Sequence, residues 1–247
     1  MNDATTAKLP AVTLGFWIIK ILATTLGETG GDTLSMTLDL GYLASTAIFA
    51  LLLLGLCWTQ ISAGQFRPWL YWATIVASTT AGTTLADFAD RSLGIGYSGG
   101  STLLLASVGA SLLAWRRVTG SIDVSSVATR RSEAFYWLTI TLSQTLGTAL
   151  GDWAADSGLG YGGGALLFGG ALAIVAALYA FTRTSRVALF WLAFVLTRPL
   201  GATVGDFFDK PLEEGGLDVD RPLASAILLV AIVLCIRFLP QRPAPRT

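Results

Sequence analysis

The feature that most restricts the fold of this chain is a repeat that occurs four times. Each copy begins with an aromatic residue followed by Trp, reaches a Gly ten positions after the Trp, and reaches an Asp five positions after the Gly. The copies run from Phe16 to Asp32, Tyr71 to Asp87, Tyr136 to Asp152 and Phe190 to Asp206. Trp and Asp are scarce in apolar segments, so a shared spacing in four places indicates an internal repeat.

The composition of the chain is typical of a membrane protein. Of its 247 residues 53% are hydrophobic and 13% are charged, whereas charged residues make up about 25% of a soluble domain. Basic and acidic residues number sixteen each, so we expect the lipid bilayer as a partner and no nucleic acid. His is absent, and Cys57 and Cys235 lie alone in separate apolar runs, which argues against the usual zinc, copper or iron–sulfur sites and covalently bound cofactors.

Eight apolar runs approach the length of about twenty residues that crosses a bilayer. The repeat lies in the odd runs, near residues 11–31, 69–86, 134–151 and 187–205, and a plainer run follows each, near 42–58, 99–115, 163–181 and 222–238. We therefore predict an all-α membrane protein of eight transmembrane helices, built from four tandem parallel helical hairpins. The small and polar faces described below place the odd helices at the centre, with pseudo-fourfold or two-plus-two symmetry.

The predicted domain is a single transmembrane unit over residues 1–247. Its repeats are expected at 11–58, 69–115, 134–181 and 187–239, with a cytoplasmic linker at 116–133 and a disordered tail at 240–247. Basic residues in the short loops gather on the side that holds Lys8, Arg67, Arg116 and Arg186. By the positive-inside rule both termini should be cytoplasmic, and the four repeat Asp residues should lie toward the outside.

Small residues at four-residue spacing recur in every copy and predict close helix packing. They are Gly27 with Gly31, Gly82 with Ala86, Gly147 with Gly151, and Gly201 with Gly205. On the first helix Thr24 and Glu28 fall on one face beside the small residues. We therefore expect the polar side chains to point inward.

The Trp residues of the repeat are Trp17, Trp72, Trp137 and Trp191. An amphipathic indole ring favours the membrane interface, so we expect these residues to be interfacial anchors at the cytoplasmic boundary. The alternative is a gate or lid at the inner mouth of a central path.

The four repeat carboxylates are Asp32, Asp87, Asp152 and Asp206. The dipole at a helix C-terminus disfavours a carboxylate. Either the helix ends there and each Asp caps a following turn, or the carboxylates face a cation or water.

Three ionisable residues break the fourfold pattern within the spans: Lys20, Glu28 and Arg198. Glu28 lies one helical turn beyond the level of Arg198, about 6 Å along the axis, so we predict that the two side chains pair between the first and last repeats. That pair is either structural or a titrating gate. Lys20 lies close to Trp17 and is expected to extend toward the interface.

Polar residues at the level of Arg198 in the other copies are Thr24, Thr79 and Gln144. Their side chains either bond to the backbone of their own helix or line a hydrated path. The Gly-rich links between runs lack the Lys and hydroxyl residue of a phosphate loop, and no motif of an ATPase or an intramembrane enzyme is present. We therefore expect no enzymatic activity.

The repeat as a whole, with its aromatic–Trp start and its final Gly–Asp or Ala–Asp, resembles a family of bacterial membrane proteins. That family is defined by a repeat of unknown function, with four copies, two membrane spans in each and a characteristic Trp. The resemblance covers nearly the whole chain. It implies a location in the bacterial inner membrane and brings no established activity.

The leading functional hypothesis is a secondary transporter or exporter of a small cation, such as Mn²⁺, Mg²⁺, Ca²⁺, Na⁺ or H⁺. Carboxylates and hydroxyls are hard oxygen ligands, and the expected ligands of a bound cation are Glu28, Asp32, Asp87, Asp152 and Asp206. One alternative is a transporter of a small anion or organic acid that uses Lys20 and Arg198. The other is a structural or accessory membrane subunit without transport, and the sequence leaves monomer and homo-oligomer open.

Overall fold

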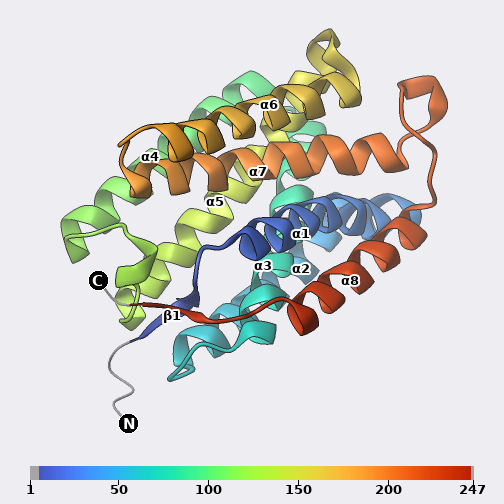
Figure 1. Ribbon diagram of the computed structural model, residues 1–247. Coiled ribbons are helices and arrows are strands. Elements are labelled where there is room, and N and C mark those ends of the chain that lie inside the picture. Colours follow the sequence, from blue (N-terminus) through green and yellow to red (C-terminus); the bar gives the residue numbers. More distant parts are fainter. Residues whose placement is uncertain (1–5, 246–247) are drawn as a thin grey trace.

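Eight α-helices dominate the computed structural model, which describes residues 6–245 (Figure 1). They are α1 (Leu14–Asp32), α2 (Gly41–Ser62), α3 (Pro68–Asp87), α4 (Tyr97–Thr119), α5 (Arg130–Ala154), α6 (Gly160–Phe181), α7 (Arg186–Asp209) and α8 (Arg221–Phe238). Single turns of π-helix follow α1, α3 and α5, at η2 (Thr33–Thr37), η3 (Phe88–Ser92) and η5 (Ala155–Leu159). Short 3₁₀ turns lie at η4 (Val124–Ser126) and η6 (Leu212–Glu214).

The four odd helices form a closed central ring. Helix α1 packs on α3, α3 on α5, α5 on α7, and α7 on α1. Their N-termini lie at one end of the bundle, because the aromatic start of every repeat lies in one cluster. This arrangement agrees with the prediction of parallel repeats with the odd helices at the centre.

The outer helices require a correction to the predicted hairpins. Helix α2 packs mainly on α3, α4 on α5, α6 on α7, and α8 on α1. Each outer helix therefore covers the central helix of the next repeat, and the two helices of one repeat make few direct contacts. Figure 1 shows the last case, with α8 beside α1.

The links explain why the repeats do not close as hairpins. In the first link Asp39 and Gly41 have positive φ, at 53° and 75°, and in the second link Gly94 and Gly96 do so, at 67° and 80°. In the third link Gly158 and Gly160 likewise have positive φ. Positive φ is a conformation that glycine adopts without steric cost. These residues follow the π-helical turns, except Gly158, which lies inside η5. Together they lead the chain away from its own central helix and onto the neighbouring one.

The central and outer helices differ in polarity. Five helical stretches among the described residues are long and apolar enough to cross a membrane: Gly41–Ser62, Tyr97–Thr119, Arg130–Phe181, Arg186–Asp209 and Arg221–Phe238. The third stretch contains α5, η5 and α6 together. Helices α1 and α3 do not meet this criterion, because their inward faces are rich in polar residues.

Both ends of the described chain meet at the N-terminal end of the central ring (Figure 1). Strand β1 (Thr6–Pro10) pairs antiparallel with β2 (Pro243–Pro245). The prediction of a disordered tail at 240–247 is therefore wrong for residues up to 245, and residues 246–247 lie outside the described part. The tail is ordered because it packs on the ring, where Gln241 Oε1 accepts a hydrogen bond of 3.0 Å from the Trp72 indole.

Candidate functional site

Five layers of four side chains fill the interior of the central ring, and successive layers are four residues apart in every repeat. In order from the N-terminal end they are Phe16, Tyr71, Tyr136 and Phe190; Lys20, Ile75, Ile140 and Phe194; Thr24, Thr79, Gln144 and Arg198; Glu28, Thr83, Thr148 and Ala202; and Asp32, Asp87, Asp152 and Asp206. All twenty residues are buried. The expected inward orientation of the polar stripe is therefore correct, and the layers change from aromatic to acidic along the axis.

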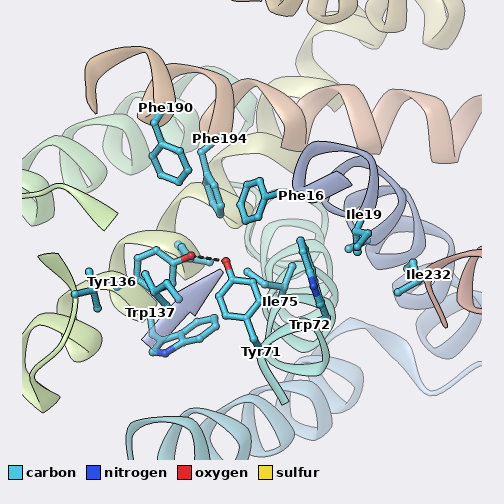
Figure 2. Close-up of a cluster of buried hydrophobic side chains, with 14 of the residues drawn as sticks. Phe16, Ile19, Tyr71, Trp72, Ile75, Tyr136, Trp137, Phe190, Phe194 and Ile232 are labelled. Carbon is cyan, nitrogen blue, oxygen red and sulfur yellow. Dashed lines mark hydrogen bonds between the residues drawn. The ribbon is translucent and has the colours of Figure 1, made fainter. Parts of the chain in front are cut away.

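The first layer closes the N-terminal end of the ring with aromatic side chains (Figure 2). Each leading aromatic ring contacts the Trp of the next repeat, with ring centroids within the roughly 4.5–7 Å that is typical of packed aromatic pairs. The four contacts are Phe16 with Trp72 at 5.4 Å, Tyr71 with Trp137 at 5.7 Å, Tyr136 with Trp191 at 6.3 Å, and Phe190 with Trp17 at 5.7 Å. The Tyr71 and Tyr136 hydroxyls also form a hydrogen bond of 2.5 Å.

This layer corrects the prediction that the four Trp residues are interfacial anchors. Trp72, Trp137 and Trp191 are at most 5% exposed, and only Trp17 is partly exposed. The C-terminal segment and the linker cover two of them, since the Trp72 indole donates to Gln241 and the Trp191 indole donates to the Ile122 carbonyl at 3.0 Å. The burial of these indole side chains is compatible with the alternative prediction, a lid at this end of the helix ring.

Lys20 lies in the second layer among apolar side chains. It is fully buried, so the expectation that it extends to the membrane interface is wrong. Its ammonium lies 4.3 Å from the centroid of the Phe194 ring, a cation–π contact, and 3.5 Å from Gln144 Oε1. Because α1 faces the interior at this position, the long side chain points across the ring rather than along it.

Arg198 connects all four repeats at the third and fourth layers. Its Nη2 lies 2.8 Å from Glu28 Oε2, so the predicted ion pair between the first and last repeats is present. The same nitrogen also donates to the Thr83 hydroxyl and, at 2.6 Å, to the Thr148 hydroxyl. Arg198 on α7 thus bonds to α1, α3 and α5. The Thr24 hydroxyl donates to the Ile21 carbonyl on its own helix and to the Thr197 carbonyl on α7, so both local and interhelical bonding occur.

The glycines of the repeat make this convergence possible. Gly27 lies against Thr79, Gly82 against Gln144, Gly147 against Arg198, and Gly201 against Thr24. The second small position follows the same rule, with Gly31 against Thr83, Gly151 against Ala202, and Gly205 against Glu28. In each case the glycine of one repeat contacts a layer residue of the next, and the fourth repeat contacts the first. The predicted role in close packing is therefore correct, and the contacts form a closed cycle.

Three of the four carboxylates of the fifth layer form ion pairs with basic residues that follow two of the helices. Lys210 Nζ lies 2.5 Å from Asp32 Oδ2 and 3.0 Å from Asp206 Oδ1. On the other side of the ring Arg91 Nε lies 2.9 Å from Asp87 Oδ1. Asp152 forms no hydrogen bond or ion pair within residues 6–245. The pairing of charges in this layer therefore does not follow the fourfold symmetry of the repeat.

The capping interpretation can be examined at Asp32 and Asp87, which each precede a π-helical turn. Asp32 and Asp87 make no capping hydrogen bond to the π-helical turns that follow them. The capping interpretation is therefore wrong for these two residues. Their carboxylates face basic groups inside the bundle, because the helix continues past each Asp instead of ending there.

Lys210 and Arg91, the basic partners of the acidic layer, were not among the predicted site residues. Each lies four residues after a repeat Asp, the spacing that brings side chains together on a helix, and this was the available signal. Burial opposes the charge of Lys210, but Asp206, Asp32 and Asp209 outweigh that effect and raise the pKa of the ammonium well above its usual value. Lys210 therefore stays protonated inside the cluster.

Three carboxylates in this region could together hold a cation. Oxygens of Glu28, Asp32 and Asp206 lie within 4.8 Å of one another, and all three side chains are buried. Asp87 and Asp152 belong to the same layer but not to this group. The expected set of five acidic ligands is thus reduced to one compact group of three, next to the Lys210 ammonium.

The fold and the interior define a helical membrane protein of four tandem repeats around a buried polar core. A family model described as Repeat of Unknown Function (DUF347) matches residues 15–66, 70–121, 135–185 and 189–242, and the chain belongs to this family. No curated protein and no solved structure matches the chain.

Proposed function

We propose that this protein is a secondary transporter of a small cation, and that all eight helices cross the bacterial inner membrane with both termini in the cytoplasm. The outer helices support a membrane location, since they expose large apolar side chains such as Leu51, Leu54 and Leu166. The polar faces of α1 and α3 point into the buried centre of the ring. Their polar faces therefore need no contact with lipid.

The observation that carries the proposal is the position of the Lys210 ammonium. It occupies the space between Asp32 and Asp206, beside Glu28, so the acidic group already holds a cation that belongs to the protein. Carboxylate oxygens are ligands for hard cations. A free cation that displaced Lys210 would meet the same buried oxygens.

In this proposal the five layers of the central ring line a cation path that is closed at both ends. Aromatic side chains fill the N-terminal end, and the ion-paired Asp layer fills the other. Lys210 follows directly after α7. Hydrogen bonds from Leu217 N to the Phe207 carbonyl and from Val219 N to the Phe208 carbonyl hold its loop against the end of α7. In our proposal, movement of this loop withdraws the ammonium, and a cation from that side takes its place.

Flux into proteoliposomes tests the proposal with Mn²⁺, Mg²⁺, Ca²⁺ and Na⁺ supplied separately. Asp32→Asn removes one ligand charge and should reduce cation flux by at least about tenfold, the factor expected for a loss of about 1.4 kcal/mol. Asp156→Asn is the matched control, because Asp156 is exposed and occupies the position in the third repeat that Lys210 has in the fourth. Equal flux in Asp32→Asn and wild type, with monodisperse protein in both, would reject the proposal.

A second candidate function is transport of a small anion or organic acid. One observation favours it: Lys20 is buried without a carboxylate partner among the described residues. Gln144 Nε2 and Arg198 Nε are also buried without hydrogen-bond partners there. Such unsatisfied donors favour a negatively charged ligand. If this candidate is correct, Lys20→Met abolishes uptake of a small carboxylate, and Asp32→Asn has a smaller effect on it.

A further inference from the structure

A groove of about 610 Å³ lies along the seam between α1 and α7, under the edge of α6. Its floor is apolar and includes Val175 on α6 together with Leu189, Phe190 and Ala193 on α7. The volume is within the range of roughly 300–1,000 Å³ that is usual for small-molecule sites. The groove is separate from the layered interior of the ring.

The two ends of the groove differ in chemistry. Thr13, Asp123 and Arg186 lie at the end that corresponds to the N-termini of the central helices, and the lining farther along the helices is almost entirely apolar. Asp123 is already bonded to the Ser125 backbone N–H. Arg186 is exposed and forms no ion pair with a described residue; its guanidinium donates to the Tyr179 carbonyl and packs on the Tyr179 ring. The mouth of the groove therefore holds an exposed guanidinium that pairs with no described carboxylate, with the hydrogen-bonded Asp123 carboxylate elsewhere in the same lining.

In the part of the chain that the structure describes, Trp17, the Trp of the first repeat, lacks the indole hydrogen bond that the Trp residues of the second and fourth repeats make. The Trp72 indole is capped by Gln241, and the Trp191 indole is capped by the linker carbonyl of Ile122. Trp17 lines the groove, is partly exposed, and makes no side-chain hydrogen bond within residues 6–245. An indole that is apolar along its body and has a free N–H is suited to a ligand with an apolar chain and a polar head.

We propose that this groove binds an anionic phospholipid of the surrounding membrane. One acyl chain lies on the apolar floor, and the phosphate lies at the mouth against the Arg186 guanidinium. Three features lead to this occupant: the single apolar channel, the charge at only one end, and the location of that end at the level where head groups lie if the helices cross the membrane. The inference does not depend on transport activity.

Native mass spectrometry of the purified full-length chain in detergent tests the proposal, with dioleoyl phosphatidylglycerol and dioleoyl phosphatidylcholine added in equal amounts. Wild type should retain one phosphatidylglycerol. Ala176→Trp fills the groove and should remove that adduct, whereas Ala177→Trp, on the neighbouring exposed position outside the lining, should leave it intact. Arg186→Gln should lower the preference for phosphatidylglycerol about fivefold, the effect of one basic residue near a head group.

Three results would overturn the proposal. They are the absence of a retained lipid in wild type, equal retention of the two lipids by wild type, and undiminished retention in Ala176→Trp. Thermal unfolding of each variant in detergent shows whether a lost adduct reflects a lost fold. A folded Ala176→Trp protein without the adduct is the outcome that supports the assignment.

Discussion

Gly201 lies directly against Thr24, so the fourth repeat packs on the first through the same contact that joins each earlier repeat to the next. The ring of central helices is closed by this contact rather than left as an open row. A stacked array has two end repeats, each with an uncovered face. In this protein the end faces of the first and fourth repeats pack on each other.

The first prediction concerns this contact. Gly201→Ala places a methyl group into the side chain and backbone of Thr24, and overpacking of this kind costs about 1–3 kcal/mol. We expect a lower melting temperature in detergent, measured by thermal unfolding. Gly109→Ala is the control, since a methyl group there meets open space on α4. Equal melting temperatures for the two variants would contradict the prediction.

The second prediction concerns the buried pair of Glu28 and Arg198. Removal of one partner leaves the other charge buried, which costs about 3–5 kcal/mol. We expect Glu28→Gln and Arg198→Met each to destabilise the protein by that amount, and the double variant to lose much less than the sum. A double-mutant cycle on unfolding free energies in detergent measures the coupling. Additive losses would show that the pair is not coupled.

The third prediction concerns pH and Lys210. Its pKa in the folded protein is raised above the unfolded value of about 10.4. Its stabilising contribution is therefore present below that pH and is lost only when pH rises through the higher folded value. Between pH 5 and about 9 the stabilising contribution of Lys210 should therefore stay constant, so it should cause no fall in the melting temperature of wild type.

Lys210→Met should behave differently. Without the ammonium, the Asp206 carboxylate loses its counter-charge and still faces Asp32, so protonation of Asp206 relieves the repulsion between them. Its melting temperature should therefore fall relative to wild type near pH 8 and approach wild type as pH is lowered toward 5. Lys210→Arg keeps the charge and should lack this trend. A constant difference between Lys210→Met and wild type across this range would contradict the assignment.

The fourth prediction concerns the aromatic layer. Trp72 is 1% exposed, so Trp72→Ala should cost about 3–5 kcal/mol of unfolding free energy. Trp17 occupies the equivalent position of the first repeat but is partly exposed, so Trp17→Ala should cost clearly less. Chemical denaturation in mixed micelles compares the two. Equal losses of unfolding free energy would contradict this prediction, because they would show that exposure at the groove does not weaken the packing of Trp17.

The layered interior was largely predictable from the sequence, because the repeat fixes which residues share a level. Aligning the copies placed Glu28 one turn beyond Arg198, and this was enough to predict their ion pair. Helical periodicity likewise predicted the inward direction of Thr24 and Glu28. These inferences need only the repeat and the geometry of an α-helix.

Other features depend on segments outside the repeat and were not predictable in this way. Burial of Trp72 depends on Gln241 in the C-terminal segment, and burial of Trp191 depends on the linker. The packing of each outer helix on the next repeat depends on link conformations such as the positive φ of Asp39. Periodicity carries no information about the direction in which a link leaves its helix.

The packing of α8 on α1 sets an order of assembly. Helix α1 is synthesised first, but its outer partner is the last helix of the chain, and its neighbour α7 also belongs to the fourth repeat. In the proposed membrane arrangement Glu28 and Asp32 therefore enter the bilayer long before their partners Arg198 and Lys210 are synthesised. The earliest helix to emerge from the ribosome is the last to be enclosed, and until then its two carboxylates lack the basic partners that they have in the finished ring.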